Sequence, residues 1–528
     1  MIFALSLGGC AVGPDYSPNA APVPTQYKEL KGWKAATPRD GVDRGDWWRF
    51  YHDPKLAVLL KQVEISNQTV AAAAASYEQA RALVRQAQAA LFPIATANYS
   101  ATHTHTGSGA GGFGGAGGGG NVTIFTPQLA STWDLDVWGK VRRQIESNSS
   151  AAQASAADLD NAKLSAQAQL ALAYFNLRAA DSLRDLLERT VKEDKETLRI
   201  TQDKFNAGFC PSPGGSNCVS EAELRSAQAL VLNAESQALN VGVQRAQFEH
   251  AIAILTGRPP AELTIATYLL GGNIPRIPVA VPSTLLERRP DIAAAERTMQ
   301  EQNALIGVAV AAYYPDITLS GMLQWVGTTP FPFNAANAVW SLGAAGTQTL
   351  FDGGLRAAQV DAARAVYWQS VANYRQTVLT AFQQVEDQLA AIRILKQQLG
   401  KQQAAVKAQR DAVRVFMNQY RAGTIDFTTV VTAQLTLLSD EEAELTIRQD
   451  LFLASVSLIE ALGGGWDTNL LPAQKDLVKE LSLLPQYSAG LDQGRQAGPN
   501  PLICSANLTT LRRSLNGPST AARGAPCP

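Results

Sequence analysis

The sequence predicts a mixed α+β membrane fold, in which strands from several chains close a β-barrel and long helices pair as antiparallel coiled coils. Three observations predict this class. The 528-residue chain is one unit written twice. Each copy contains two segments in which apolar and polar residues alternate, as they do in strands. Each copy also contains a much longer segment of helix-forming residues with apolar positions at helical spacing.

The internal repeat is visible in matched segments along most of the chain. AALFPIATANYSA around Pro93 matches AAYYPDITLSG around Pro315, and KFNAG at Gly208 matches QYRAG at Gly423. The register between the copies changes only at the Gly-rich segment THTHTGSGAGGFGGAGGGGN and at the insert CPSPGGSNC, as expected for insertions in loops. The repeat predicts a first copy at residues 55–270, a linker at 271–285 and a second copy at 286–466.

The N-terminus has the features of a shortened lipoprotein leader. Met1–Gly9 reads MIFALSLGG, and the small residues before Cys10 have the spacing of a lipoprotein cleavage site. We interpret residues 1–9 as a residual signal peptide and residues 10–54 as an N-terminal extension lipidated on Cys10. The alternative is a buried N-terminal strand with a structural cysteine.

The alternating segments predict one β-hairpin in each copy, at about residues 94–137 and 316–351. Leu129 and Trp133 share a face in the first copy, and Leu319 and Leu323 share a face in the second. Strands of about 9 to 11 residues cross a bilayer obliquely. Two hairpins cannot close a barrel, and an open strand edge is not tolerated in lipid. Chains must therefore pool their strands.

A short helix is expected before each hairpin and a long helix pair after it. Lys140–Ala207 contains no proline or glycine and would extend roughly 100 Å as one helix, and Arg356–Ala422 repeats the feature with one glycine, Gly400. Gly208 and Gly423 end these runs, and second helical runs follow at Glu221–Leu255 and Thr428–Leu462. Two antiparallel pairs result, at about 139–257 and 355–462. Abundant alanine lets helices approach closely, which favours a curved wall around a tunnel.

Composition and cysteine spacing narrow the function classes. A net charge of -1, from 45 basic and 46 acidic residues without long single-sign blocks, excludes a nucleic-acid partner. No apolar run reaches the roughly 20 residues of a membrane-spanning helix. The close spacing within two cysteine pairs suggests an oxidising compartment and two local disulfides. The pairs are Cys210 with Cys218 and Cys504 with Cys527, while other connectivities and free thiols stay open.

No catalytic site, metal site or cofactor site is expected. His103 and His105 lack nearby Cys or carboxylate ligands, so a solvent-facing strand end is favoured over a zinc site. The glycines between Gly107 and Gly120 imitate a nucleotide loop, but no Lys-Ser/Thr follows them. Residues 467–528 are expected to be an exposed periplasmic tail without an assigned role.

Four segments together carry a family resemblance. They are DWWRF with Asp53-Pro54, VPSTLLERRPDI from Val281, LFDGGLRAAQVDAARA from Leu350, and YRAGTIDFTTVVTAQLTLL from Tyr420. They resemble the outer membrane factor family of TolC-like channels, most closely its NodT-type lipoprotein branch. The resemblance implies a trimeric, twelve-stranded transmembrane β-barrel with four strands per chain, continued by a long periplasmic α-helical barrel.

The resemblance also implies a function. It implies the exit channel of a tripartite efflux system in the outer membrane of a Gram-negative bacterium, a passive conduit for small molecules. Its partners would be outer-membrane lipid, two sister copies, a periplasmic adaptor and an inner-membrane pump of the RND type. Ala11 after Cys10 permits the outer membrane. The alternatives are a coiled-coil lipoprotein that spaces the membranes, which the hairpin strands disfavour, and the channel of an ATP-driven type I exporter.

By the same resemblance, the turns at Gly208 and Gly423 become periplasmic tips at which the duct narrows and the adaptor docks. The matching residues are Phe205, Asn206, Gly208, Tyr420, Arg421, Ala422, Gly423 and Thr424. Tyr420 and Arg421 are the gate candidates, and the alternative is a solvated helix end whose arginine favours the dipole. The family often has Asp where Thr432 stands, so an acidic gate is in doubt here. Asp426 is either a substitute charge or a turn former.

Overall fold

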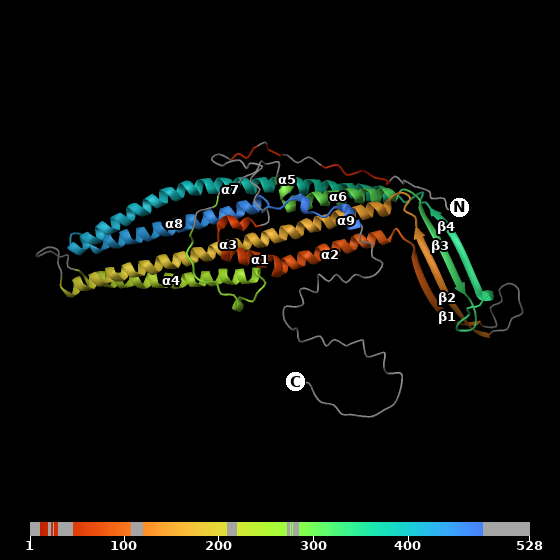
Figure 1. Ribbon diagram of the computed structural model, residues 1–528, viewed down its shortest axis with the longest axis horizontal. Helices are drawn as coiled ribbons and strands as arrows, with labels where there is room; N and C mark the ends of the chain where they lie inside the picture. Colours follow the sequence, from red (N-terminus) through yellow and green to blue (C-terminus); the bar gives the residue numbers. More distant parts are fainter. Residues whose placement is uncertain are drawn as a thin grey trace, which may run out of the picture. The chain divides into compact units, whose positions relative to one another are not determined.

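Two long antiparallel helix pairs continue at one end into a four-stranded sheet (Figure 1). The computed structural model describes residues 11–18, 23–24, 26–29, 46–106, 120–208, 219–271, 275, 277 and 285–478. Among these described helices, none combines the length and the apolar content needed to cross a membrane. Several predicted features lie outside the described residues, namely the leader at residues 1–9, Cys10, Cys210, Cys218, Cys504 and Cys527.

The long helices account for most of the chain. The first pair is α3 (Lys140–Asn206) with α4 (Glu221–Leu255), and the second is α7 (Leu355–Ala422) with α8 (Phe427–Ala461). Within each pair the two helices lie side by side, and α3 also packs against α8, which joins the pairs (Figure 1). α7 continues through Gly400, although glycine weakens a helix by about 1 kcal/mol.

The sheet is antiparallel, in the order β1-β2-β3-β4. Its strands are β1 (Ile94–Thr106), β2 (Gly120–Asp134), β3 (Asp316–Trp325) and β4 (Ala338–Thr347). Leu129 lies opposite Leu323, and Trp133 lies opposite Leu319, so the two predicted apolar faces form one face. Among the described residues, the outer edges of β1 and β4 have no strand partner. One chain therefore supplies an open sheet.

Shorter helices precede each hairpin. They are α1 (Pro54–Ser66) and α2 (Gln68–Ala89) in the first copy, and α5 (Leu285–Arg288) and α6 (Pro290–Ala311) in the second. Asn67 separates α1 from α2, because its side-chain oxygen accepts hydrogen bonds from the N–H groups of Thr69 and Val70 at 2.9 and 3.0 Å. α6 packs between α3 and α7. Short 3-10 helices lie in the connections at η2 (Pro260–Glu262), η4 (Ala335–Asn337) and η5 (Thr468–Leu470).

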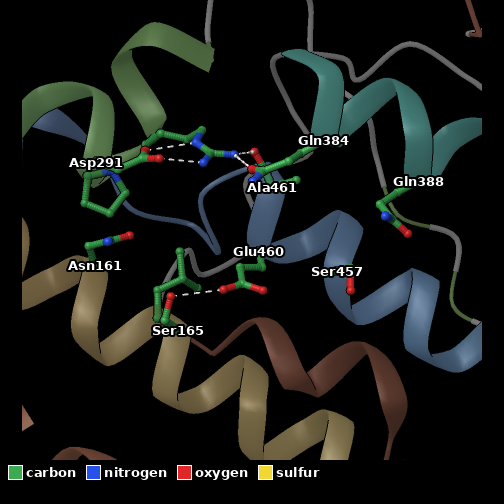
Figure 2. A pocket seen from close by; sticks show the side chains of 11 residues that line it. Asn161, Ser165, Asp291, Gln384, Gln388, Ser457, Glu460 and Ala461 are labelled. Atoms are coloured by element: carbon green, nitrogen blue, oxygen red, sulfur yellow. Dashed lines mark hydrogen bonds and ion pairs between the residues drawn. The ribbon is translucent and has the colours of Figure 1, made fainter. Parts of the chain in front are cut away.

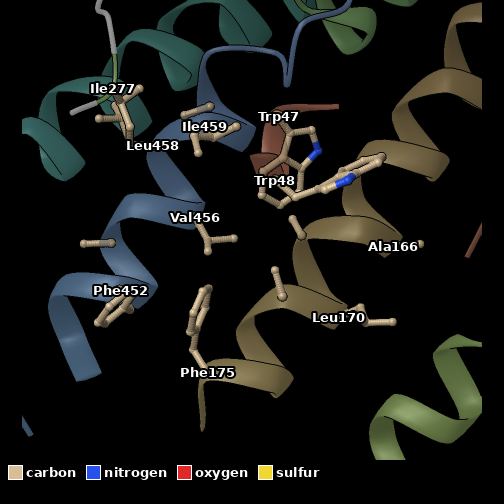
Figure 3. Packing of buried hydrophobic residues seen from close by; sticks show 14 of the residues in the cluster. Trp47, Trp48, Ala166, Leu170, Phe175, Ile277, Phe452, Val456, Leu458 and Ile459 are labelled. Atoms are coloured by element: carbon tan, nitrogen blue, oxygen red, sulfur yellow. The ribbon is translucent and has the colours of Figure 1, made fainter. Parts of the chain in front are cut away.

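The main apolar core lies where the helix pairs meet a short N-terminal element, η1 (Trp47–Tyr51). Trp47 and Trp48 are buried there beside α3 and α8 (Figure 3). Phe175 of α3 and Phe452 of α8 stack with their ring centroids 4.9 Å apart. The Trp47 indole N–H donates to Gln167 Oε1 of α3 at 3.2 Å. The two copies of the repeat thus share one core, which the tryptophan segment completes.

The chain after the second copy does not begin as an exposed tail. Trp466 is buried and donates to Asp160 Oδ2 at 2.8 Å. Leu477 of α9 (Gln474–Val478) packs against Val84 and Ala152. Leu470 and Val478 are exposed, whereas Leu477 is buried and Leu471 is partly buried against Trp466, so residues 467–478 lie along the helices instead of extending away from them. These residues cover alanine-rich helix surfaces that would otherwise meet water.

Candidate functional site

The turn that joins α7 to α8 depends on a glycine. Gly423 follows Ala422 with a φ of 76°, in the left-handed region that other residues rarely adopt. The Gly423 N–H donates to Tyr420 O at 3.0 Å, and the Thr424 N–H donates to Gln419 O at 2.9 Å. These are the two hydrogen bonds of a Schellman motif. Gly423 therefore fixes the direction in which the chain leaves α7.

Asp426 begins the return helix. It lies directly before α8, and its Oδ1 atom accepts hydrogen bonds from the Thr429 N–H at 3.0 Å and from the Thr429 hydroxyl. These bonds hold the pKa of the Asp426 carboxyl below its usual range. Asp426 is thus an N-cap that stays ionised at neutral pH. Of its two interpretations, the geometry supports the turn former.

The turn that follows α3 is less completely described. Asn206 is the last residue of α3, where its side-chain oxygen accepts from Gln202 Nε2 at 2.9 Å. Phe205 is partly exposed, and Gly208 has a φ of 63°. On the other side of the insert, Ser220 forms a capping box for α4: its hydroxyl accepts from the Glu223 N–H at 3.3 Å, and Glu223 Oε2 accepts from its N–H at 3.0 Å.

Tyr420, the first gate candidate, is buried within the chain. Its exposed fraction is 3%, and its hydroxyl lies 3.0 Å from the Thr201 hydroxyl of α3. The Lys204 ammonium lies 4.0 Å from the centroid of the Tyr420 ring and donates to the Tyr420 carbonyl. Burial raises the pKa of Tyr420 and lowers the pKa of Lys204. Tyr420 therefore attaches the end of α7 to α3.

Arg421, the second gate candidate, points to a different part of α3. It is exposed, and its Nη2 atom lies 3.5 Å from Glu196 Oε1. Arg199 binds the same carboxylate, with Nε 2.9 Å from Glu196 Oε2, and this contact holds the pKa of Glu196 below its usual range. Solvent screens these exposed pairs, so Arg421 contributes less to the attachment than Tyr420 does.

Five residues form what we call the polar seam between the two helix pairs: Thr197, Thr201 and Lys204 of α3, Tyr420 of α7 and Gln434 of α8. The α3 residues lie on one face of that helix because they are spaced by four and three positions. Gln434 Nε2 donates to the buried Thr197 hydroxyl at 3.0 Å. Near the tips the pairs are thus joined by hydrogen bonds as well as by the small apolar cluster around Ile200 and Phe427.

A cavity of about 470 Å³ lies between α7 and α8 beside the second turn. Its wall includes Asp426 and four threonines, namely Thr428, Thr429, Thr432 and Thr436. The Thr432 hydroxyl donates to Thr428 O at 2.8 Å, and the Thr436 hydroxyl donates to Thr432 O at 2.8 Å. Thr432 therefore gives this wall a neutral hydroxyl where an aspartate would give a charge. The only charged side chain lining the cavity among the described residues is Asp426.

A second polar cavity, of about 390 Å³, lies far from the tips among α3, α6, α7 and α8 (Figure 2). Arg289 crosses it: Nη2 lies 2.6 Å from Asp291 Oδ2, and Nη1 donates to Gln384 Oε1 and Ala461 O, both at 2.9 Å. Glu460 accepts from the Ser165 hydroxyl at 3.1 Å, and burial raises its pKa. Arg289 belongs to the ERRPDI segment. Its contacts clamp the start of α6 to α7 and α8.

The described residues offer no obvious metal centre. No group of three His, Cys, Asp or Glu side chains among them is placed to hold a metal ion. His103 Nδ1 lies 2.8 Å from the Thr123 hydroxyl, and His105 Nδ1 lies 2.5 Å from Asn121 Oδ1, both on the neighbouring strand.

The structure brings some of the predicted tip residues together and adds others. Tyr420, Arg421, Ala422, Gly423, Thr424 and Asp426 form one turn, while Phe205, Asn206 and Gly208 lie at the end of α3. Sequence reasoning missed the polar seam partners Thr197, Thr201 and Lys204. Their four- and three-residue spacing on one helix was the available signal. Gln434 lies in the segment YRAGTIDFTTVVTAQLTLL, which was named only for the family resemblance.

These features define a class: a channel subunit that supplies four strands to a membrane β-barrel and two coiled-coil pairs to a helical wall. The profile of the outer membrane efflux protein family matches residues 59–258 and 281–464. The chain therefore belongs to the outer membrane efflux protein family. Members of this family are channel proteins.

Individual relatives and structures agree with this family. The chain is 30% identical over 468 residues to the probable efflux pump outer membrane protein TtgC of Pseudomonas putida, covering 88% of this chain and 94% of that protein. It is 28% identical to nodulation protein T of Rhizobium leguminosarum, covering 88% and 96%. The outer-membrane channel OprN superposes with a TM-score of 0.78 at 28% identity, covering 87% of this chain and all of OprN.

The comparisons confirm the fold class and the main function predicted from the sequence. The chain has the fold of the trimeric outer-membrane channels, in which a β-barrel continues into a long helical barrel. It is the outer-membrane component of an efflux system, and its location is the outer membrane.

Proposed function

We propose that three copies of this chain form the passive exit duct of a tripartite efflux pump for small molecules. The open sheet is the observation that carries this assembly. β1 and β4 each present an unpaired edge among the described residues, and unpaired backbone groups are strongly unfavourable in hydrocarbon. Pairing β4 of one copy with β1 of the next removes both edges and gives twelve strands around one pore.

Lipidation of Cys10 fits the position of the residues that follow it. The Val12 N–H donates to Trp138 O at 3.1 Å, and Gly139 leaves no room for a side chain beside Ala11. Trp138 and Gly139 lie between the end of β2 and the start of α3. If the strands span the bilayer, this junction lies at the periplasmic surface of the membrane. An acyl group on Cys10 would therefore enter the membrane next to the barrel.

The ends of the helix pairs are the proposed gate and adaptor-docking region. The polar seam holds the second pair against α3 through hydrogen bonds that can break and re-form without unfolding either pair. Separation of α7 and α8 from α3 at this end would widen the duct. The energy would come from an inner-membrane pump of the RND type, with a periplasmic adaptor bridging the two proteins, as the efflux pump relatives suggest.

The test combines mass and conductance. Native mass spectrometry of the detergent-solubilised protein should give a trimer in which each copy carries one lipid-modified Cys10. In planar bilayers, Thr201→Val should raise the open probability of the pore. Thr446→Val is the matched control, because the exposed Thr446 hydroxyl donates to the Glu442 carbonyl of its own helix, at 2.9 Å, and to no other group among the described residues. A trimer that conducts no ions, even with the polar seam weakened, would indicate a membrane spacer and would contradict the duct.

A further inference from the structure

A cavity of about 340 Å³ opens between α4 and α8, with α3 as its floor. It lies next to the polar seam, on the side away from the turn at Gly423. Asp194 of α3 and Gln434 of α8 line it, together with Thr190 and the leucines Leu230, Leu435 and Leu438. Its volume lies within the usual range of small-molecule sites, roughly 300 to 1,000 Å³. Leu435 is 49% exposed, so the cavity can be reached from solvent.

Two hydrogen-bond acceptors in the cavity receive no donor from the described chain. Asp194 is 2% exposed, and no hydrogen bond or ion pair reaches its carboxylate from the described residues. Gln434 is 8% exposed, and its Oε1 atom is buried without a hydrogen-bond partner in the described chain. Buried polar atoms normally have partners, and an unpaired buried carboxylate is especially unfavourable. The cavity thus combines an enclosed amide oxygen with the carboxylate of a buried aspartate, and both can accept from a bound donor.

The charges around the cavity favour a cation. Glu193 neighbours Asp194 on α3, and α8 supplies Glu441 close to Glu193. Of the nearby cations, Lys195 lies 2.7 Å from Glu235 of α4, Arg410 of α7 binds Glu441, and Arg189 lies 3.2 Å from Asp185. Lys192 of α3 forms no ion pair with Asp194 among the described residues. The potential at Asp194 is therefore negative and uncompensated.

We propose that this cavity is a binding site for a primary alkylammonium group, whose N–H donors bind Asp194 and Gln434 Oε1 while its hydrocarbon stem lies along Leu230, Leu435 and Leu438. An ammonium group carries three donors and no acceptor, which suits a carboxylate, an amide oxygen and the nearby Thr190 hydroxyl oxygen. The cavity has a single carboxylate, and its other polar lining residues, Thr190, Asn233, Ser236, Gln237 and Gln434, are neutral. A hard divalent cation is usually held by more than one charged oxygen ligand, so one carboxylate suits a monovalent ammonium group better.

Binding would connect the two helix pairs. Asp194 belongs to the first pair and Gln434 to the second. A bound ammonium group would therefore link α3 to α8 beside the polar seam and oppose the separation of these two helices. The ammonium group can come from a free amine or from a lysine side chain of a protein partner. The site itself depends only on contacts within one chain and does not require the proposed efflux role.

Calorimetric titration of n-butylammonium chloride into the full-length protein in detergent tests the site. At pH 7.5 the wild type should bind butylammonium and not 1-butanol. Asp194→Asn should weaken binding about tenfold or more, as loss of a hydrogen bond to a charged group predicts. Burial raises the pKa of Asp194 to about 6, so binding should also weaken about tenfold at pH 5.

Asp185→Asn is the matched control, since Asp185 lies on the same helix but is exposed and paired with Arg189 at 3.2 Å. Equal binding by Asp194→Asn and wild type, or equal binding of butanol and butylammonium, would overturn the proposal.

Carbodiimide treatment of cell envelopes distinguishes the two sources of the amine. The reagent joins an activated carboxylate to a primary amine in contact with it. An Asp194 peptide whose mass has increased by a small amine identifies a free ligand, and one linked to a lysine-containing peptide identifies a protein partner. An Asp194 peptide with no more amine adduct than the Asp185 peptide would show that the cavity holds no amine and would overturn the assignment.

Discussion

The hydroxyl groups of Thr201 on α3 and Tyr420 on α7 lie 3.0 Å apart, and both side chains are buried close to the ends of these helices. The Thr201 hydroxyl also lies 2.8 Å from Thr197 O. Tyr420 therefore has a specific partner on the other copy of the repeat, close to the turn that Gly423 fixes. This contact gives the proposed gate a residue-level mechanism, because it must break when the end of α7 leaves α3.

Tyr420→Phe should weaken the closed tip without disturbing the fold. The ring keeps its packing against Lys204 and Phe427, and only the hydroxyl contact with Thr201 is lost. The loss of such a hydrogen bond costs about 1 kcal/mol, which corresponds to roughly a fivefold shift toward the open state for each copy. Single-channel recording of the reconstituted protein measures the open probability.

Tyr367→Phe is the control for this change, because Tyr367 lies near the other end of α7, far from the turn. Its open probability should stay at the wild-type value. Equal open probabilities for Tyr420→Phe and wild type would show that the hydroxyl pair does not hold the gate.

The fold was predictable because its signals are local. The helical run predicted at Glu221–Leu255 coincides with α4, and the alternation at Leu129 and Leu323 placed both residues on the face that they share. The predicted start of α8 differed by one residue, since the capping bond of Asp426 to Thr429 was not part of the pattern. Periodicity reports which residues face inward, and this is enough to define helices and strands.

The polar seam was not predictable by the same means. Thr197 and Gln434 are both buried, although threonine and glutamine at helical positions usually face solvent. Their contact joins residues that are far apart in the sequence, and only the packing of α3 against α8 brings them together. The packing of Leu477 against α2 and α3 was missed for the same reason, because a five-residue helix has too short a pattern to indicate a partner.

Asp194→Asn should stabilise the protein at neutral pH. Burial raises the pKa of Asp194 from 3.8 to about 6, with a smaller contribution from Glu193. Between about pH 4 and pH 6 the folded protein keeps a proton that the unfolded chain has lost, so the free energy of unfolding falls as the pH rises. Above pH 6 the ionised and buried Asp194 carboxylate lowers the free energy of unfolding by its full amount, at most about 3 kcal/mol. The asparagine variant avoids it.

Thermal unfolding of wild type and Asp194→Asn across this pH range measures the effect. The variant should have the higher melting temperature at pH 7.5, and the difference should disappear near pH 4. Asp185→Asn should show no gain at any pH, because Asp185 is exposed. A lower melting temperature for Asp194→Asn at pH 7.5 would mean that the ionised carboxylate is stabilised in the native protein.

Leu342→Lys should block assembly in the membrane, whereas Ser341→Lys should be tolerated. Leu342 of β4 is 80% exposed and lies opposite Gly321, on the apolar face that includes Leu319 and Leu323. Ser341 lies on the other face, opposite Met322. A lysine that faces lipid near the bilayer midplane costs about 2 to 4 kcal/mol, while a lumen-facing lysine meets water.

The fraction of protease-resistant trimer in outer-membrane preparations measures this difference. The two variants have the same added charge at adjacent positions, so general effects of lysine on synthesis and export cancel. Similar trimer fractions for both variants would contradict the assignment of the apolar face to lipid.

Arg289→Met should destabilise the helical part of the protein far more than Arg288→Met. The Arg289 guanidinium pairs with Asp291 and donates to Gln384 Oε1 and Ala461 O, so its removal leaves a partly buried carboxylate and a buried carbonyl without their donor. Removing one partner from a buried pair costs about 3 to 5 kcal/mol, and the partial exposure of Asp291 places this case at the lower end. Arg288 is less buried and should change the free energy of unfolding by less than about 0.5 kcal/mol when it is replaced.

Urea unfolding followed by circular dichroism compares the two variants, each of which loses one positive charge. Equal midpoints would mean that the clamp between α6, α7 and α8 does not depend on Arg289.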